Sequence, residues 1–392
     1  MHATKVLQKA LHTAIAQLDV RNVRNLFFAV EALIAGRRLT LMELARHFPD
    51  AERVHAPLKR FDRLLGNHSM QALRTAFYQE AATWLLRNRR PVILVDWSEV
   101  KSDGKWHLLR AALSAHGRAL TLYEEVHPQS RKNSPEIEAQ FLRRLQGLLP
   151  RHVRPILITD AGFRVPWFRS VETAGWHWIG RVRGTTRLRF PGKSSSIGCR
   201  RLFVRATHRA RSLGLALLTD RHAFLCRLVL IKHRGSGRHH CIRRGKRRAH
   251  NGHSEKMAAR VKEPWLLAVS ASLDALSPAH VTKLYAQRMQ IEQSFRDLKS
   301  HRFGCAFEDT LTRRPERLEM LLLIHALASL AAWLEGLNAL NEMNPTLPTT
   351  PPRRFHSITW VGFERLRRQR AHLSRPPAAT IIRLRQLLAE AA

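Results

Sequence analysis

The sequence predicts an α/β fold that follows a helical N-terminal region. Two apolar segments carry this prediction: residues 91–95 and 155–159 each begin with Pro and are followed by an acid, Asp96 and Asp160. Short apolar runs rich in β-branched residues are typical of central strands that are buried on both faces. The region between them, 97–155, combines strand-like and helical patterns, and strands that alternate with helices indicate a layered α/β domain.

Residues 1 to about 88 have helical patterns. A break at 36–39 ends the first pattern, and Thr40 is placed to cap the next helix. A basic amphipathic pattern continues through 59–65. Such a helical bundle can place a helix in a DNA groove or against phosphates, and the alternative is a plain bundle with a cationic surface.

After Asp96, residues 106–126 are expected to form strands and residues 135–149 a helix. The chain between Asp160 and Glu292 is long enough to form a subdomain of its own. Four strands are predicted there, at 176–183, 199–207, 223–232 and 265–270.

One helix is predicted from Pro278, with Ser277 as its N-cap and Gly304 as its stop. Five apolar residues recur at helical spacing and form a core-facing stripe: Val281, Leu284, Ile291, Phe295 and Leu298. Four polar residues border this stripe within about 60° of one another: Tyr285, Arg288, Glu292 and Lys299. The alternative interpretation is a solvated helix flank with an Arg/Glu pair at i,i+4 spacing.

Three carboxylates, Asp96, Asp160 and Glu292, are candidate metal ligands. Each Asp taken alone is equally explained as a turn residue or a helix cap. Carboxylates that converge from two strands and a helix can hold two Mg²⁺ about 4 Å apart, and two ions can stabilise the attacking and leaving oxygens at a phosphodiester.

The composition indicates a polyanionic partner. The chain has 67 Lys and Arg against 30 Asp and Glu, a formal net charge of +37, which exceeds what solubility requires. Residues 181–211 contain ten Lys and Arg and no acid, and residues 232–262 contain eleven against Glu255 alone. We expect phosphate contacts from these stretches, with solvated basic loops as the alternative.

No targeting segment is expected. The N-terminus lacks a signal-peptide pattern, which favours a cytoplasmic, nucleoid-associated protein. The longest apolar stretch, Met320 to Leu334, is 15 residues long, so we expect a buried helix and no membrane association. The four cysteines form no CxxC pair, so neither a zinc site nor a disulfide framework is indicated.

The pattern Tyr-x2-Arg-x3-Glu-x6-Lys, from Tyr285 to Lys299, resembles the C-terminal signature of the bacterial DDE transposases in the insertion-sequence-four family, which contains the transposases of transposons five and ten. The strand that ends in Asp96 and the stretch 159–163 resemble that family's first and second acidic motifs. The order Asp, Asp, Glu also matches, and the resemblance spans about residues 20 to 340.

The resemblance implies an RNase H-like catalytic core interrupted by a β-rich insertion. The expected domains are an N-terminal helical DNA-binding domain over 1–88 that recognises terminal inverted repeats, a catalytic domain over 89–343 with its insertion at about 175–272, and a linker with a helical C-terminal region over 344–392. For that last region the family suggests dimerisation or DNA contact.

By resemblance, Asp96, Asp160 and Glu292 are the catalytic ligands of two Mg²⁺ or Mn²⁺ ions. Three further residues are expected to hold phosphates beside the cut, namely Tyr285, Arg288 and Lys299. Trp265 would stack on a base flipped out of the transposon end, and the alternative is that it only packs.

The expected activity is cut-and-paste transposition through a DNA hairpin, by a homodimer assembled on the DNA. Two alternatives remain open. One is a metal-dependent nuclease on the same fold, which cleaves but joins nothing; the other is a DNA-binding transposase derivative without catalysis. A strand-transfer product distinguishes the first alternative, and the three carboxylates with the complete helical signature argue against the second.

Overall fold

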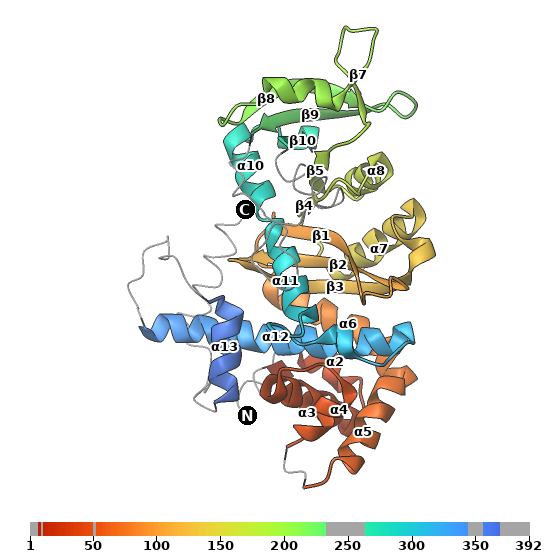
Figure 1. The fold of residues 1–392 in the computed structure, drawn as a ribbon, viewed down its shortest axis with the longest axis vertical. Coiled ribbons are helices and arrows are strands. Elements are labelled where there is room, and N and C mark those ends of the chain that lie inside the picture. The colour runs from red at the N-terminus through yellow and green to blue at the C-terminus, as the bar shows by residue number, and fades with distance from the viewer. Residues whose placement is uncertain (1–6, 9–10, 50–51, 233–262, 344–355, 369–392) are drawn as a thin grey trace, which may run out of the picture. The chain divides into compact units, whose positions relative to one another are not determined.

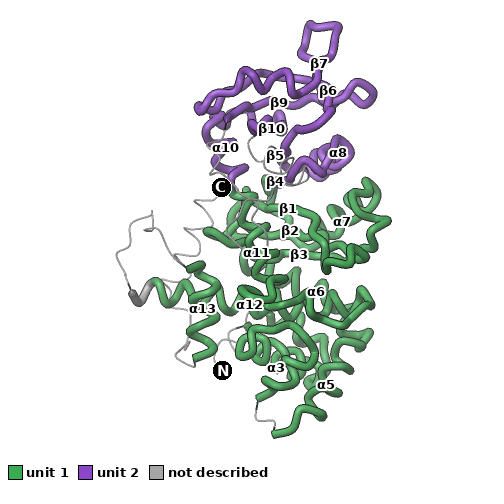
Figure 2. Tube along the Cα trace, in the orientation of Figure 1, with its two compact units in different colours: residues 1–156, 287–392 green, residues 157–286 purple. Residues whose placement is uncertain are grey.

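A computed structural model describes residues 7–8, 11–49, 52–232, 263–343 and 356–368. The chain divides into two compact units (Figure 2), which comprise residues 1–156 with 287–392, and residues 157–286.

The first unit begins with helices, which confirms the helical prediction for the described part of residues 1–88 (Figure 1). Thr40 caps the third of them as expected, because its side chain accepts a hydrogen bond of 3.3 Å from Glu43 N. The helices are α2 (His12–Ala16), α3 (Val20–Gly36), α4 (Leu41–Arg46), α5 (His55–Gly66) and α6 (His68–Leu85).

Three antiparallel strands follow, in the order β3-β2-β1. They are β1 (Val92–Glu99), β2 (Trp106–Ala115) and β3 (Arg118–Pro128), and they lead through a 3-10 turn, η1 (Gln129–Arg131), to the predicted helix α7 (Pro135–Leu148). The expectation that Asp96 ends its strand is wrong. The ladder continues through Glu99, which pairs with His107, so Asp96 lies in the middle of β1.

A row of charged residues crosses these strands. Asp96 pairs with Arg110, and Arg110 pairs with Glu124, so the three side chains project from one face of the sheet. Arg110 Nε donates to Glu124 Oε2 at 2.7 Å. Both side chains are buried, at 1% and 0% exposure. From α6, Tyr78 donates its hydroxyl to Glu124 Oε1 at 3.0 Å and Arg74 donates to the Glu124 carbonyl at 2.7 Å.

The prediction of a single helix from Pro278 is wrong, because the chain forms two helices, α10 (Pro278–Ala286) and α11 (Met289–Lys299). The start is as predicted: the Ser277 side chain accepts from His280 N at 3.2 Å. At the break, Gln290 N and Ile291 N bond three residues back, to Gln287 O and Arg288 O. The break coincides with the boundary between the two units, and beside it Gln287 Oε1 accepts from Ser114 Oγ at 2.6 Å and Gln290 Oε1 accepts from Ala115 N at 2.9 Å.

The helix α11 ends at Lys299, before the predicted stop at Gly304. Gly304 instead permits a close approach, because a Cβ there would overlap the carbonyl oxygens of Arg296 and Asp297. A 3-10 turn, η4 (Phe307–Asp309), follows.

The apolar stretch from Met320 lies in α12 (Pro315–Met343), a helix longer than predicted. It is long and apolar enough to cross a membrane, but most of its apolar stretch is buried inside the protein. The helix α13 (Ile358–Arg367) packs closely on it through Gly336 and Gly362.

In the second unit the strands follow the order β4-β5-β10-β9-β8-β6-β7. Three of the four predicted strands are confirmed. The strand predicted at 199–207 is wrong, because these residues form a 3-10 helix after the two-residue strand β7. The elements are β4 (Ile156–Thr159), α8 (Val165–Thr173), β5 (His177–Val182), β6 (Arg187–Arg189), β7 (Ile197–Gly198), η2 (Cys199–Arg205), β8 (Arg211–Leu218), β9 (Phe224–Ile231), β10 (Trp265–Val269), η3 (Ala271–Leu273) and α10.

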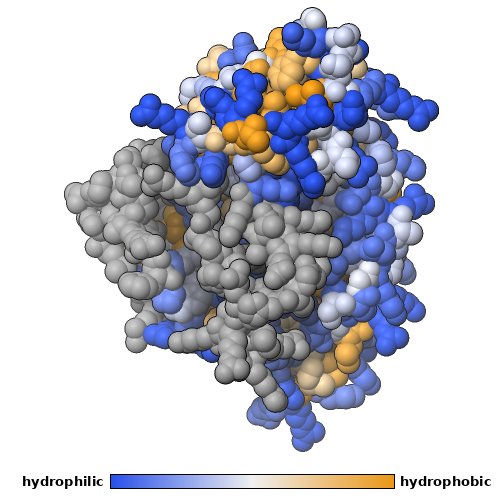
Figure 3. All heavy atoms as spheres, turned by 45° about the horizontal axis from the view of Figure 1, so that its top comes forward, coloured by the Kyte–Doolittle hydropathy of each residue, from blue (hydrophilic) through white to orange (hydrophobic). Residues whose placement is uncertain are grey.

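One face of the second unit carries a hydrophobic patch among hydrophilic side chains (Figure 3). Among the described residues of this unit, the large hydrophobic side chains that are exposed are Val204, Leu215 and Leu225. Two of its arginines, Arg183 and Arg187, pair with carboxylates at 2.6 and 2.7 Å, so part of the predicted basic stretch is neutralised locally. Residues 233–262 of the second basic stretch lie outside the described residues, as do residues 344–355 and 369–392 of the predicted linker and C-terminal region.

Replacing Gly362 by Ala is expected to destabilise the first unit. A Cβ there would overlap the carbonyl oxygen of Ala332 in α12, so the two helices must separate. We expect the free energy of unfolding to fall by about 2 kcal/mol. The control is Gly147→Ala in α7, where a Cβ meets nothing within 4 Å. That change should raise stability by up to about 1 kcal/mol. Urea unfolding of both variants checks the prediction, and equal effects would contradict it.

Buried His325 in α12 predicts a loss of stability in mild acid. Burial, with nearby Arg110 and Arg37, lowers the pKa of His325 to about 3. Below about pH 6.5 the unfolded chain binds a proton that the folded chain does not, so stability falls by up to about 1.4 kcal/mol per pH unit.

The measurement is urea unfolding at pH 7 and pH 5. The variant His325→Gln should lose less stability than the intact protein between these pH values, whereas the control His222→Gln, at an exposed position, should behave like the intact protein. Identical pH dependence for His325→Gln and the intact protein would show that His325 does not contribute.

Candidate active site

Two of the predicted catalytic carboxylates lie together in the first unit, on either side of one guanidinium. Asp96 projects from β1, and Glu292 lies in the first turn of α11, a helix that packs on β1, β2 and β3 (Figure 1). Arg288, the residue before α11, places Nη1 at 3.4 Å from Asp96 Oδ2 and Nη2 in hydrogen-bond contact with Glu292 Oε1. The Arg/Glu pair of the alternative interpretation therefore forms, but the same guanidinium also reaches Asp96, 192 positions away along the chain, which a solvated helix flank does not explain.

The surroundings of the two carboxylates differ. Asp96 is buried, with 9% of the residue exposed, and its Oδ1 accepts a hydrogen bond of 2.9 Å from Trp97 N. The Glu292 side chain is 39% exposed. Two neighbouring carboxylates repel each other, and the planar fork of Arg288 offsets this repulsion by bonding to both.

Lys299, the last residue of α11, binds the end of β1. Its Nζ donates to Ser98 Oγ and to Glu99 O, each at 3.0 Å. Burial lowers the pKa of Lys299, while Glu308 and Glu99 act in the opposite direction. The ammonium is thus held in place on the strand that carries Asp96.

The second unit carries the remaining predicted residues. Asp160 directly follows β4, as expected, and its Oδ1 accepts from Gly162 N at 2.8 Å, so it also has a role in the turn. Trp265, at the start of β10, and buried Tyr285 in α10 pack edge to face with ring centroids 5.0 Å apart. The structure thus brings Trp265 and Tyr285 together; the roles of Asp160, Trp265 and Tyr285 on DNA stay predictions.

One contact near Asp96 was missed by the sequence analysis. Trp97 Nε1 donates to Glu138 Oε1 at 3.1 Å, and Glu138 is buried in α7. This bond ties the residue after Asp96 to the helix beyond the sheet. No spacing rule could reveal it, because the partners lie 41 positions apart in different elements.

Metal binding by these residues fits their chemistry. Carboxylate oxygens are the ligands that Mg²⁺ prefers, and Asp96 and Glu292 supply them within one unit. In the part of the chain that the structure describes, no group of three or more His, Cys, Asp or Glu side chains is placed to hold a metal ion. Arg288 supplies positive charge between the two carboxylates instead.

Comparison with known families decides the identity of this region. Residues 87–331, more than half of the chain, match the transposase DDE domain family. The chain belongs to this family. Asp96, Arg288, Glu292 and Lys299 all lie within the matched DDE domain. A search of the curated proteins returned no match.

The family indicates a transposase, an enzyme of nuclease type, and it implies DNA as the substrate. DDE transposases generally use divalent metal ions. The mixed α/β architecture with its large sheet content fits a DDE domain of RNase H-like type.

Replacing Arg288 by Gln is expected to destabilise the protein in the absence of divalent cations. The change leaves Asp96 and Glu292 next to each other without the bridging charge, so we expect stability to fall by about 1–2 kcal/mol. Added Mg²⁺ or Mn²⁺ should restore more stability to this variant than to the intact protein, because the cation replaces the lost charge.

Thermal unfolding with and without the cation measures both effects. The control is Arg46→Gln, which removes an exposed pair with Glu43 at i,i+3 spacing and should change stability by at most about 0.5 kcal/mol. An Arg288→Gln variant as stable as this control, with no greater response to cations than the intact protein, would contradict the bridging role.

Proposed function

We propose that this protein is a DNA transposase of the insertion-sequence-four group, which binds the terminal inverted repeats of its element and catalyses cleavage and strand transfer. The observation that carries the proposal is the bridge from Arg288 to Asp96 and Glu292 within a matched DDE domain. A guanidinium shared by two carboxylates holds the residues that the reaction needs in one place.

In this proposal Asp96, Asp160 and Glu292 hold two Mg²⁺ or Mn²⁺ ions. When bound, the ions activate water or a 3′-OH and stabilise the charge on the attacking and leaving oxygens. The oxygen-only ligand set suits these ions, and the partial exposure of Glu292 leaves a route for a cation to reach it.

The cationic residues act on the DNA backbone. Once cations take over the two carboxylates, the fork of Arg288 is available to donate two parallel hydrogen bonds to a phosphate beside the cut. Lys299, held by Ser98 and Glu99, contributes a point charge on the same side of the sheet. Each residue thereby orients the scissile phosphate without forming a covalent bond to it.

The second unit would handle the distorted DNA end. Trp265 is half-buried and its ring is braced by Tyr285, so one aromatic surface can stack on a flipped base with little loss of side-chain freedom. Such stacking favours the hairpin intermediate of a cut-and-paste pathway. Tyr285 would also contact a phosphate near the cut.

The proposal assigns the N-terminal helices to recognition of the terminal repeats. The excess of cations, +37 for the chain, supports extended contact with DNA phosphates. Cutting and joining two ends requires two copies of the chain, so the active form is proposed to be a homodimer on DNA in the cytoplasm, at the nucleoid.

The test compares the intact protein with Glu292→Gln on a duplex that carries the element's own terminal repeat. With Mg²⁺, the intact protein should give nicked, hairpin and joined products on a denaturing gel. The Gln variant should lose at least about 10³-fold in cleavage rate, because one ligand to the ions is gone, while DNA binding persists.

Glu316→Gln is the matched control, since Glu316 is exposed in the first turn of α12 and should leave cleavage unchanged. Cleavage without any joined product would favour a nuclease. Binding without cleavage in both Mg²⁺ and Mn²⁺ would sink the catalytic proposal.

A further inference from the structure

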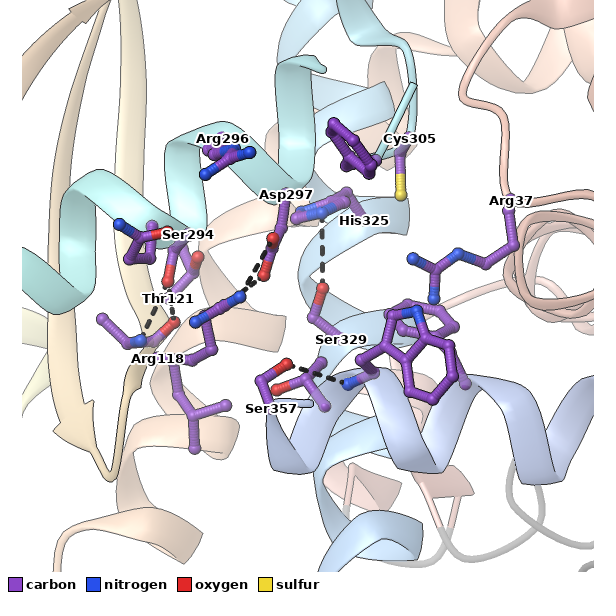
Figure 4. A pocket seen from close by; sticks show the side chains of 18 of the residues that line it. Arg37, Arg118, Thr121, Ser294, Arg296, Asp297, Cys305, His325, Ser329 and Ser357 are labelled. Atoms are coloured by element: carbon purple, nitrogen blue, oxygen red, sulfur yellow. Dashed lines mark hydrogen bonds and ion pairs between the residues drawn. The ribbon is translucent and has the colours of Figure 1, made fainter. Parts of the chain in front are cut away.

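A pocket of about 660 Å³ opens in the first unit between β3, α11 and α13 (Figure 4). None of the residues that line it is Asp96, Arg288, Glu292 or Lys299, so it is distinct from the candidate active site. Its most unusual feature is its charge, because five arginines line it: Arg37, Arg110, Arg118, Arg296 and Arg302.

The two carboxylates that line this arginine pocket are already paired. Asp297 binds Arg118, and Figure 4 shows this pair side by side at the wall formed by β3 and α11. Glu364 lies 2.8 Å from Arg367 and 3.6 Å from Arg368. Neither carboxylate is therefore left to neutralise the other arginines.

The guanidinium groups of three of the arginines lie against aromatic rings. The guanidinium of Arg37 lies 4.0 Å above the Phe363 ring. Those of Arg296 and Arg302 lie 5.5 and 5.0 Å from the Phe303 ring. Among the described residues, none of the three has a carboxylate partner. A ring covers the face of a guanidinium and leaves the N–H groups at its edge able to donate.

Three side chains that line the pocket carry buried polar atoms without a partner. Arg37 Nη1 and Arg110 Nη1, which are donors, and His325 Nδ1 are buried and make no hydrogen bond within the described part of the chain. The Arg110 side chain is 1% exposed and His325 is 5% exposed. Burying such groups without partners costs about 1–3 kcal/mol each, and native proteins seldom do so. A ligand whose acceptor oxygens reach these groups would offset this cost.

A phosphate group meets this demand, because its oxygens accept several hydrogen bonds and match the planar fork of arginine. The volume lies in the range of small-molecule sites and exceeds what one phosphate fills. Trp360, 37% exposed and stacked on His356, adds an aromatic surface at the rim. We propose that this pocket binds a nucleotide through its phosphate, either free or as one unit of a DNA strand.

Arg37 provides the sharpest test, because its neighbour is a natural control. Arg37 enters the pocket from the end of α3 (Figure 4), whereas Arg38 does not line it and lies near Asp309 at the surface. Titration calorimetry with dAMP and with inorganic phosphate, without divalent cations and at about 0.15 M salt, separates pocket binding from general attraction to a basic protein.

We expect saturable binding of one dAMP, tighter than phosphate alone. Arg37→Gln should weaken it roughly tenfold, because a charge-assisted hydrogen bond is lost, and Arg38→Gln should not change it. If Arg37→Gln fails to fold by circular dichroism, Arg302→Gln at the exposed rim serves instead. Light-induced coupling of 8-azido-dAMP should label peptides from 293–305 or 356–364.

Competition identifies the source of the nucleotide. If a short single-stranded oligonucleotide displaces dAMP from the intact protein, and displaces it only poorly from the Arg37→Gln variant, the natural ligand is a DNA strand. If the oligonucleotide does not displace dAMP, the natural ligand is a free nucleotide. The proposal is overturned by any of three results: no saturable binding up to about 10 mM dAMP, equal losses in Arg37→Gln and Arg38→Gln, or labelling elsewhere. Because no cleavage is measured, these results are independent of the transposase activity.

Discussion

The first unit depends on the buried ion pair between Arg110 and Glu124. Taking both charges out of water costs several kcal/mol per ion, and their mutual attraction offsets this cost best where further hydrogen bonds satisfy the remaining polar atoms. Tyr78 and Arg74 supply further bonds to Glu124, so the pair ties α6 to the centre of the β2–β3 hairpin. Loss of either partner would leave an uncompensated charge in the core. Register and helix packing are therefore fixed by the same residues.

The same row of charged residues continues into the candidate active site, where the carboxylates are paired in a different way. Asp96 pairs in register with Arg110 but bonds to Arg288, which also holds the more exposed Glu292. Of these side chains Glu292 is the most exposed, so it is where an incoming cation would compete with the guanidinium for the carboxylate oxygens. The Arg110–Glu124 pair is closed to solvent on both partners, and the Arg288 bridge is open to solvent at Glu292.

Helix α11 contributes residues to two sites of opposite charge. Its Glu292 and Lys299 face the strand that carries Asp96, whereas Arg296 and Asp297 line the arginine pocket. At the first site carboxylates outnumber the guanidinium that joins them; at the second, arginines outnumber the carboxylates. A cation therefore suits one side of the helix and an anion the other.

The sequence by itself determined where most elements lie, because apolar runs and 3.6-residue periodicity are local properties: the strands before Asp160, the helices over residues 1–88 and the cap at Ser277 could all be read from it. It also showed that Glu292 and Arg288 lie one turn apart, so that a pair between them was one of the two interpretations. The tertiary structure decided the rest. The break between Ala286 and Met289, the continuation of β1 past Asp96 and the donors without acceptors around Arg110 all depend on contacts between residues far apart in the chain, whose energies no local pattern contains.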